Sequence, residues 1–224
     1  MTWSYCAQTV KERDPARFLV TLNQRKSVQE SIFALLAFNC EISKTSSYVS
    51  NEMLGHIRFQ WWREAIEEIY SSKEDQKNVR KHEVVQALFL LRKTLPQNLL
   101  IHLIDVHVQD LTNEQFVSVE GLEKYAADTE GTITRLIGYI LEAEPDGTSE
   151  RALNHLGASW YLSGLALDSS KREIECSKEL DCEVIAREAW KHLESSKQAD
   201  LNEFAAYSAF ITSRLKALSR AGYN

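Results

Sequence analysis

Apolar side chains recur every three or four residues along most of the chain, which is the period of an α-helix. The clearest case is the stretch 27–46, in which the apolar positions are Ile32, Leu35, Leu36, Phe38 and Ile42. No stretch alternates apolar and polar residues over the length of a strand, and no unit repeats at a fixed period. The pattern predicts one all-α domain over residues 1–224, built from about eight to ten helices.

Polar residues that accept hydrogen bonds from backbone N–H groups mark the predicted helix starts. Asp14 is a predicted N-cap because Pro15 follows it at the first helical position. The other predicted caps are Ser50, Ser118, Ser149 and Asp200, the last with Glu203 three residues on. The hydrophilic stretch 71–83 is predicted to be an exposed connection between two helices.

The segment 54–70, LGHIRFQWWREAIEEIY, carries two adjacent tryptophans on a predicted helix. One apolar stripe is Leu54, Ile57, Trp61, Ala65 and Ile69, and a neighbouring one is Trp62, Ile66 and Tyr70. So broad an apolar face predicts a buried helix with both tryptophans packed inside. Arg58 and Arg63 on the same helix either meet an anionic group or, more simply, form ion pairs with Glu64, Glu67 or Glu68.

Composition and charge exclude several classes of protein. The net charge is −6 and no cluster of five or more lysines and arginines occurs, so the chain lacks the basic face that nucleic-acid binding needs. Its cysteines form no Cys-x-x-Cys pair, which favours free thiols in a reducing compartment. The N-terminus does not resemble a secretory signal, and the apolar runs are too short for a membrane span. We expect a location in the cytoplasm or the mitochondrial matrix, with room for peripheral membrane contact.

Three local patterns bear on binding sites. Residues 102–110 offer the helical pairs His102 with Asp105 and His107 with Asp110, which point in different directions and favour local hydrogen bonds over one metal site. Gly131 within a helix indicates either close packing of another backbone or a ligand against the helix. The small residues of 156–168, LGASWYLSGLALD, allow the same two interpretations.

Several segments, in their order along the chain, resemble the squalene/phytoene synthase family. They are LLAFNCEI (35–42), LGHIRFQWWREAIEEI (54–69), DLTNEQFVSVEGLEKYAADTEGTITRLIGYIL (110–141) and LGASWYLSGLALD (156–168). The resemblance is closest to a divergent branch that contains a mitochondrial complex I assembly factor. It implies an isoprenoid-synthase fold with helices around a central apolar cavity. Active members of the family join two prenyl diphosphates head to head, using Mg²⁺ held by two Asp-x-x-x-Asp motifs.

The chain departs from the family at these two motifs. Ser43 and Ser47 stand where the first motif has its aspartates. In the second motif Asp168 matches the first aspartate, but Arg172 stands at the position of the second. One aspartate of four cannot assemble a cluster of magnesium ions, which needs several carboxylate oxygens.

The resemblance therefore leaves two functions. The first is a non-catalytic protein that binds an isoprenoid or another lipid, or a protein partner, as in respiratory complex assembly. The alternative is an active transferase that condenses prenyl diphosphates with Mg²⁺ through displaced acids such as Glu41, Asp110, Asp128 and Asp168. A cavity filled by side chains, with function confined to the surface, is a third possibility.

The residues that the resemblance and the spacing nominate are few. Candidates for lining a ligand cavity are Glu41, Arg58, Trp61, Asp110, Tyr125, Thr129 and Gly131. Asp168 is the one candidate for a metal ligand, because it alone matches a motif aspartate.

Overall fold

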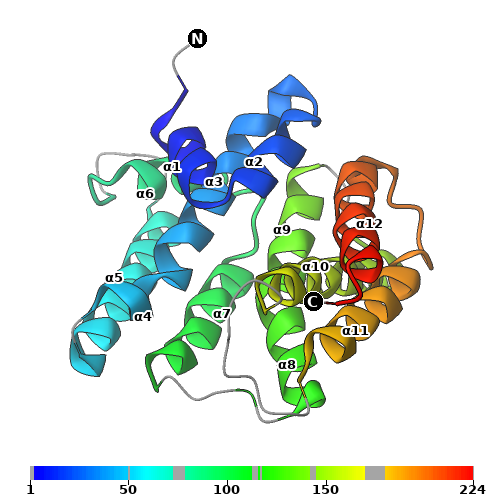
Figure 1. Cartoon of the computed structure of the whole chain (residues 1–224). Coiled ribbons are helices and arrows are strands. Elements are labelled where there is room, and N and C mark those ends of the chain that lie inside the picture. The colour runs from blue at the N-terminus through cyan, green and yellow to red at the C-terminus, as the bar shows by residue number, and fades with distance from the viewer. Residues whose placement is uncertain are drawn as a thin grey trace. The chain divides into compact units, whose positions relative to one another are not determined.

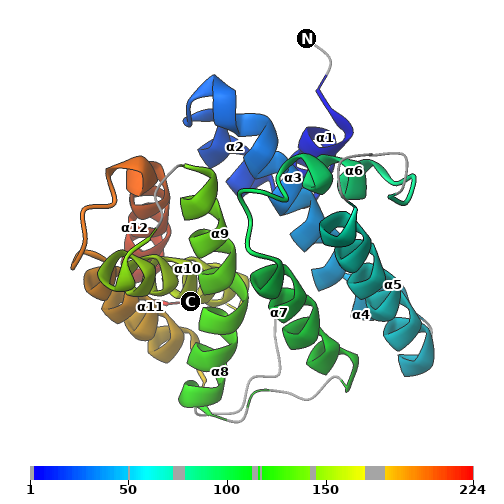
Figure 2. The ribbon, with the colours of Figure 1, turned by 180° about the vertical axis from the view of Figure 1, so that it is seen from behind.

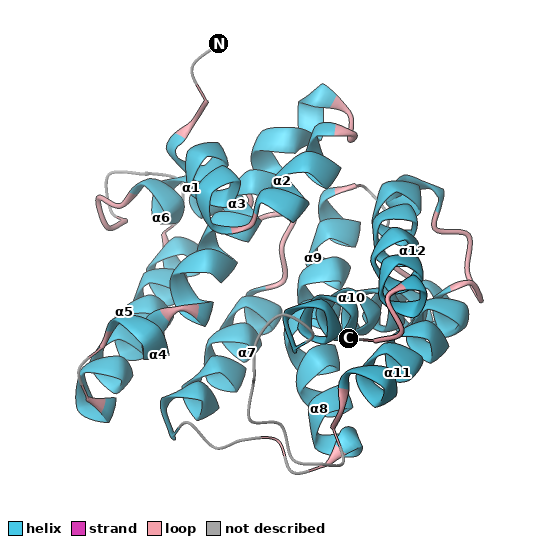
Figure 3. Cartoon of the chain, viewed as in Figure 1, coloured by secondary structure: helices cyan, strands magenta, loops and turns pink. Residues whose placement is uncertain are grey.

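Helices form all of the regular secondary structure in the described residues, which are 3–49, 51–72, 79–112, 116, 118–141, 145–169 and 180–223 (Figure 3). This computed structural model therefore confirms the predicted all-α class. None of the helices in the described ranges combines the length and the apolar character needed to cross a membrane.

The chain divides into two compact units, one formed by residues 1–113 with 139–143 and the other by 114–138 with 144–224. The first unit contains α1 (Tyr5–Arg13), α2 (Pro15–Leu22), α3 (Lys26–Ser43), α4 (Thr45–Tyr48), α5 (Glu52–Ser71), α6 (Glu83–Leu90), α7 (Gln97–Val108) and the 3₁₀ turn η2 (Gln109–Thr112). The second contains α8 (Val119–Ala126), the π-helical turn η3 (Ala127–Gly131), most of α9 (Thr132–Ile140), α10 (Gly147–Ser169), α11 (Cys182–Ser196), the 3₁₀ turn η4 (Asn202–Phe204) and α12 (Ala205–Arg220). The single domain predicted for 1–224 stays a prediction.

In the first unit, α3 forms the centre of the core and packs against α1, α2 and α6 (Figure 1). Every residue from Ile32 to Ile42 on this helix is buried, which accounts for the dense apolar pattern of the sequence. The Oδ1 atom of Asp14 accepts a hydrogen bond from the backbone N–H of Arg17 at 3.0 Å, and Pro15 opens α2. Both features were predicted from the sequence and are confirmed.

The tryptophan helix α5 runs side by side with α7 in both views (Figures 1 and 2). Its start differs from the prediction by one residue. The Asn51 side chain accepts from the N–H of Leu54 at 3.0 Å and caps the helix, whereas Ser50 lies outside the described residues. At Gly55 the helix approaches η2 so closely that a Cβ atom there would clash with the side chain of Leu111.

In the second unit, α8, η3 and α9 follow one another without a loop, and α10 packs across η3. The predicted cap Ser118 is confirmed, since its Oγ accepts from the N–H of Gly121 at 3.1 Å. Helix α10 also packs along α11 and α12, and the Ser159 hydroxyl donates to the Ala189 carbonyl of α11 at 2.7 Å. The small side chains of α10 thus allow close helix packing, which was one of the two interpretations.

In the second unit, two predicted helix starts were wrong. Helix α10 begins at Gly147, where Asp146 accepts from the N–H of Ser149 at 2.8 Å, so Asp146 rather than Ser149 caps the helix. A carboxylate is as good an N-cap as a hydroxyl, and the sequence offered both. Asp200 does not start the last helix either, because η4 intervenes and α12 begins at Ala205.

Candidate functional site

A pocket of about 350 Å³ lies in the first unit beside the first half of α5. Its lining residues are Glu41 from α3, Leu54, Ile57, Arg58, Trp61 and Trp62 from α5, and His82, which precedes α6. Glu41, Arg58 and Trp61 were three of the sequence-predicted cavity residues, and this pocket brings them together. Their assignment as ligand-binding residues stays a prediction.

The apolar wall of the pocket comes from the stripe of α5 that was predicted to be buried. Leu54 and Ile57 are instead 45% and 60% exposed, and Trp61 is half-buried. The prediction was wrong for the first half of the stripe, because Phe59 and Trp62 take the core side of the helix there. Farther along, Ala65, Ile66 and Ile69 are buried as predicted.

The polar end of the pocket is an ion-paired group of three side chains. One oxygen of Glu41 lies 3.1 Å from Nη1 of Arg13 and the other lies 3.0 Å from Nη2 of Arg58. Glu41 is buried, whereas 40% of the Arg58 side chain is exposed. Arg58 lines the pocket and keeps part of its side chain exposed, so its guanidinium is the group at this end that an anion can contact.

The tryptophans and His82 form an aromatic cluster behind this polar end. The ring centroids of Trp61 and Trp62 are 5.0 Å apart in an edge-to-face arrangement, and the His82 ring lies within 5.5 Å of both. Trp62 also contacts Phe38 of α3 edge to face at 5.3 Å. The Trp61 ring thus packs edge to face on Trp62 and His82, and it presents an aromatic surface to the pocket.

Arg80 holds the connection before α6 against this cluster. Its guanidinium lies 4.9 Å from the Trp61 ring and donates to the Trp61 carbonyl at 2.7 Å. It also pairs with Glu64 at 2.6 Å and with Glu68 at 3.0 Å, and the hydrogen bond from Arg80 lowers the pKa of Glu64. The connection 71–83 was predicted to be exposed. This holds for Ser71, Lys81 and Glu83 and is wrong for Val79, which is buried, and for Arg80, which is half-buried; residues 73–78 lie outside the described residues.

The expected partners of the α5 arginines were also wrong. Arg58 pairs with Glu41, and Arg63 pairs with Asp105 of α7 through two hydrogen bonds of 2.6 and 2.9 Å. Residues on neighbouring helices thus replace the predicted partners on α5. Pairs three or four residues apart contribute only about 0.2–0.5 kcal/mol, so a better-placed carboxylate on another helix readily wins.

The residues at the first motif do not fit a magnesium cluster. Helix α3 ends at Ser43 and α4 begins at Thr45, so Ser43 and Ser47 do not share one continuous helix face. Glu41, the nearest carboxylate, has an arginine on each of its oxygens. Asp168 lies exposed near the end of α10, and Arg172 lies outside the described residues. No group of three or more metal-ligating side chains gathers within the described ranges.

The other candidates are not among the residues that line this pocket. Asp110 accepts a 2.7 Å hydrogen bond from the Nδ1 atom of His107, one of the two local pairs expected from the sequence. Tyr125, Thr129 and Gly131 belong to the second unit. There the Thr129 hydroxyl donates to the Tyr125 carbonyl at 2.7 Å, while Gly131 packs against Asn154 of α10. Asp128 pairs with Lys124 at 2.9 Å. Their role in lining a central cavity stays a prediction.

Sequence reasoning missed four residues that contribute to the pocket or to its ion pairs. Arg13 lies 28 residues before Glu41, and no local spacing signals that the two meet. His82 lies in a stretch whose hydrophilic composition predicted an exposed connection. The exposed Leu54 and Ile57 had a detectable signal, because two apolar stripes on one helix are more than one core-facing side can bury.

The chain is similar in sequence to curated proteins from several animals that share one name. The mouse protein "NADH dehydrogenase (ubiquinone) complex I, assembly factor 6" is 29% identical over 182 residues, which cover 76% of this chain and 51% of the mouse protein. The human protein of the same name is 28% identical over 153 residues, which cover 68% of this chain and 45% of that protein. The chain thus spans about half the length of these curated relatives.

Solved structures confirm the predicted isoprenoid-synthase-like fold. The squalene synthase HpnC from Alicyclobacillus acidocaldarius has a TM-score of 0.78 at 12% identity, covering 98% of this chain and 93% of that one. A dehydrosqualene synthase in complex with a ligand has a TM-score of 0.75 at 12% identity, covering 98% and 86%. Residues 10–218 match the squalene/phytoene synthase family model. The chain therefore belongs to the squalene/phytoene synthase family.

Proposed function

We propose that this chain is a non-catalytic member of its family that binds an amphipathic anionic lipid of isoprenoid type and acts with a protein partner in the assembly of a respiratory complex. The observation that carries the proposal is the state of the first motif. Ser43 and Ser47 replace its aspartates, and Glu41 is neutralised by Arg13 and Arg58. Serine hydroxyls are poor substitutes for the carboxylates that bind Mg²⁺.

The chemistry of the pocket supports a lipid with an acidic head group. Leu54, Ile57 and Trp61 offer an apolar wall, and the half-buried Arg58 lines the pocket with them. An isoprenoid chain gains free energy when the apolar wall leaves water, at about 25 cal/mol per Å² of apolar surface. The guanidinium of Arg58 then favours a phosphate or carboxylate head over a neutral one, because it can donate charge-assisted hydrogen bonds to such a group.

The assembly role rests on the relatives named complex I assembly factor 6, which this chain matches over about half of their length. The proposal places the chain in the mitochondrial matrix or, in a bacterium, in the cytoplasm. In cells that carry the gene, its deletion should lower the amount of assembled NADH dehydrogenase complex on native gels. An unchanged amount of that complex would argue against the assembly role.

The lack of catalysis is tested directly. Purified chain is incubated with farnesyl diphosphate or geranylgeranyl diphosphate and Mg²⁺, and the products are separated by chromatography. We expect no squalene-type or phytoene-type product above the level of a heat-denatured sample. Formation of either product by the chain would overturn the proposal in favour of an active transferase that uses displaced acids and Mg²⁺.

Lipid binding is tested separately from catalysis. Farnesyl diphosphate is titrated in EDTA while tryptophan fluorescence is recorded, since Trp61 lines the pocket. We expect saturable binding, weakened about tenfold in Arg58→Gln because a charge-assisted contact worth about 1.5 kcal/mol is lost. Arg63→Gln is the matched control, since Arg63 lies on the same helix but pairs with Asp105 outside the pocket. Equal loss in both variants would contradict the assignment of the pocket.

A further inference from the structure

The first half of α5 exposes large apolar side chains to solvent. Met53, Leu54 and Ile57 are 72%, 45% and 60% exposed. The opposite side of the same turns packs inward, since Phe59 is fully buried and Gly55 lies against η2. The core of the first unit therefore accounts for one side of this half-helix and leaves the other side uncovered.

The exposed apolar residues form one narrow strip along the helix. At about 100° per residue, Met53, Leu54, Ile57 and Trp61 fall within an arc of about 100°, and none of the charged residues of 53–61 falls in it. These four residues are called the α5 face below. A narrow apolar strip on an otherwise polar helix is typical of a helix that lies flat at the boundary between water and lipid.

The α5 face is continuous with the candidate lipid pocket. Leu54, Ile57 and Trp61 belong to both, and Arg58, which follows Ile57 at the border of the face, also lines the pocket. Met53 is the one member of the face that does not line the pocket. An isoprenoid chain in the pocket would thus contact the same side chains that the molecule exposes to its surroundings.

We propose that the α5 face docks on a lipid bilayer, from which the pocket takes up its isoprenoid lipid. The inference rests on the proposed function, because it names the partner that supplies the ligand of that site. With Met53 and Ile57 among the acyl chains, the partly exposed Arg58 lies at the level of the phosphate groups and can donate hydrogen bonds to them. Tryptophan, the fourth residue of the face, is also common at this depth.

Two features favour a bilayer over a protein as the occupant of the face. An isoprenoid lipid resides in bilayers, because its apolar chain is driven out of water. A protein seated on Leu54 and Ile57 would cover side chains that the lipid has to contact in the pocket. A bilayer covers the same side chains with mobile acyl chains, so it can shield the face and deliver the lipid at the same place.

The test is flotation of the chain with vesicles on a density gradient in EDTA. The vesicles contain phosphatidylcholine and phosphatidylglycerol in equal amounts, and the unaltered chain should float with them. Met53→Gln keeps the approximate size of the side chain and suits a helix, but it would place an amide among the acyl chains. It should lower the partition constant about tenfold, which corresponds to about 1.4 kcal/mol.

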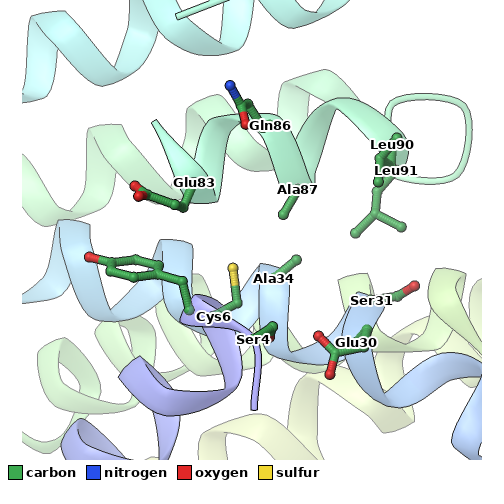
Figure 4. A pocket seen from close by; sticks show the side chains of 11 residues that line it. Ser4, Cys6, Glu30, Ser31, Ala34, Glu83, Gln86, Ala87, Leu90 and Leu91 are labelled. Atoms are coloured by element: carbon green, nitrogen blue, oxygen red, sulfur yellow. The ribbon is translucent and has the colours of Figure 1, made fainter. Parts of the chain in front are cut away.

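The matched control is Leu90→Gln, which replaces another strongly exposed apolar side chain of the same unit. Leu90 is 69% exposed and lines a separate pocket of about 360 Å³ between α1, α3 and α6 (Figure 4). That pocket shares no lining residue with the candidate site, and its lining includes the carboxylates of Glu30 and Glu83. Because charged groups are costly in the acyl region, Leu90→Gln should leave vesicle binding unchanged.

A second measurement separates membrane docking from lipid binding. Met53→Gln should bind farnesyl diphosphate in solution as the unaltered chain does, which also shows that the variant is folded. Binding of farnesyl diphosphate without flotation of the unaltered chain would overturn the docking proposal and leave the lipid site standing. Flotation that Met53→Gln weakens, without any binding of farnesyl diphosphate, would support docking and overturn the lipid site.

Two further results would overturn the docking proposal. Equal flotation of the unaltered chain and Met53→Gln, or an equal loss in Met53→Gln and Leu90→Gln, would show that the α5 face does not meet the bilayer. Size-exclusion chromatography tests a second copy of the chain as the occupant. A dimer of the unaltered chain that Met53→Gln dissociates, with no change in flotation, would assign the face to that second copy.

Discussion

Gly157 of α10 lies directly against the backbone of Glu130 in the π-helical turn. A Cβ atom at residue 157 would overlap the Glu130 carbonyl and come within 2.6 Å of the Cα atom of Gly131. Backbone atoms cannot rotate aside as a side chain can, so α10 and η3 would have to separate. We predict that Gly157→Ala lowers the free energy of unfolding by about 2–3 kcal/mol, as measured by urea denaturation.

The matched control for this substitution is Gly147→Ala at the start of the same helix. Nothing lies within 4 Å of a Cβ atom placed at Gly147. Alanine also favours helix over glycine, so the control should be neutral or slightly stabilising. Equal destabilisation by both substitutions would contradict the close approach of α10 to η3.

Arg80 is predicted to stabilise the first unit through the aromatic cluster. Arg80→Met keeps the length of the side chain but removes its bonds to Glu64, Glu68 and the Trp61 carbonyl. The loss should be about 1–2 kcal/mol by chemical denaturation, because each net hydrogen bond contributes about 1 kcal/mol and the group is partly exposed. Lys81→Met, at an exposed neighbouring position, serves as the control and should change stability little.

Glu41 and Arg58 are predicted to have opposite effects on lipid affinity. Glu41→Gln removes one negative charge from the polar end of the pocket and frees Arg58 from its carboxylate partner, so farnesyl diphosphate should bind more tightly. The same change should lower stability by about 2–3 kcal/mol, because Arg13 and Arg58 lose their shared carboxylate. Arg58→Gln should weaken binding. A purely structural role of this group would lower affinity in both variants.

His155 gives the second unit a predicted dependence on pH. Its Nδ1 atom lies 2.9 Å from Nδ1 of His192, whose Nε2 atom lies 3.1 Å from Glu123. Burial, and then the nearby His192, lower the pKa of His155 below 6.5, against the opposing effect of Glu123. His155 therefore binds a proton more readily in the unfolded chain than in the folded one. Its contribution to the free energy of unfolding is fully present above pH 6.5 and is lost as the pH falls below that value.

The measurement compares unfolding of the unaltered chain and of His155→Gln between pH 5 and pH 8. The difference in stability between the two proteins should be constant above pH 6.5 and shift in favour of the variant below it. A comparison of this kind cancels the titration of the four histidines other than His155 and its neighbour His192. A difference that does not change with pH would show that His155 has no altered affinity for protons.

Much of the fold followed from local signals in the sequence. The spacing of Ile32, Leu35 and Leu36 predicted α3, and Asp14 before Pro15 predicted the start of α2. Such signals act within one helical turn and do not depend on the rest of the molecule. Predictions of N-caps failed where two side chains that can accept a hydrogen bond stood close together in sequence, as with Asp146 and Ser149. The choice between them depends on where the preceding loop delivers the chain, which no local rule contains.

The candidate site was predicted less completely. Resemblance to the family nominated Glu41, Arg58 and Trp61, and the structure brings these three into one pocket. Arg13 and His82 were not foreseen, because their contacts join segments distant in sequence. Arg63 shows the same limit, since its partner Asp105 lies 42 residues away and replaced the predicted neighbours. Spacing along a helix identifies which residues share a face, but not which carboxylate of another helix meets them.

The π-helical turn at Ala127–Gly131 has a consequence for how this chain is compared with others. A π turn holds roughly one residue more than an α turn, so it behaves as a one-residue insertion within a continuous helix. Every position of α9 is then rotated by about 100° relative to an uninterrupted continuation of α8. An ungapped alignment with a homologue that lacks the turn would pair buried positions such as Ile133 and Leu136 with surface positions. A gap placed at this turn restores the correspondence of the two helix faces.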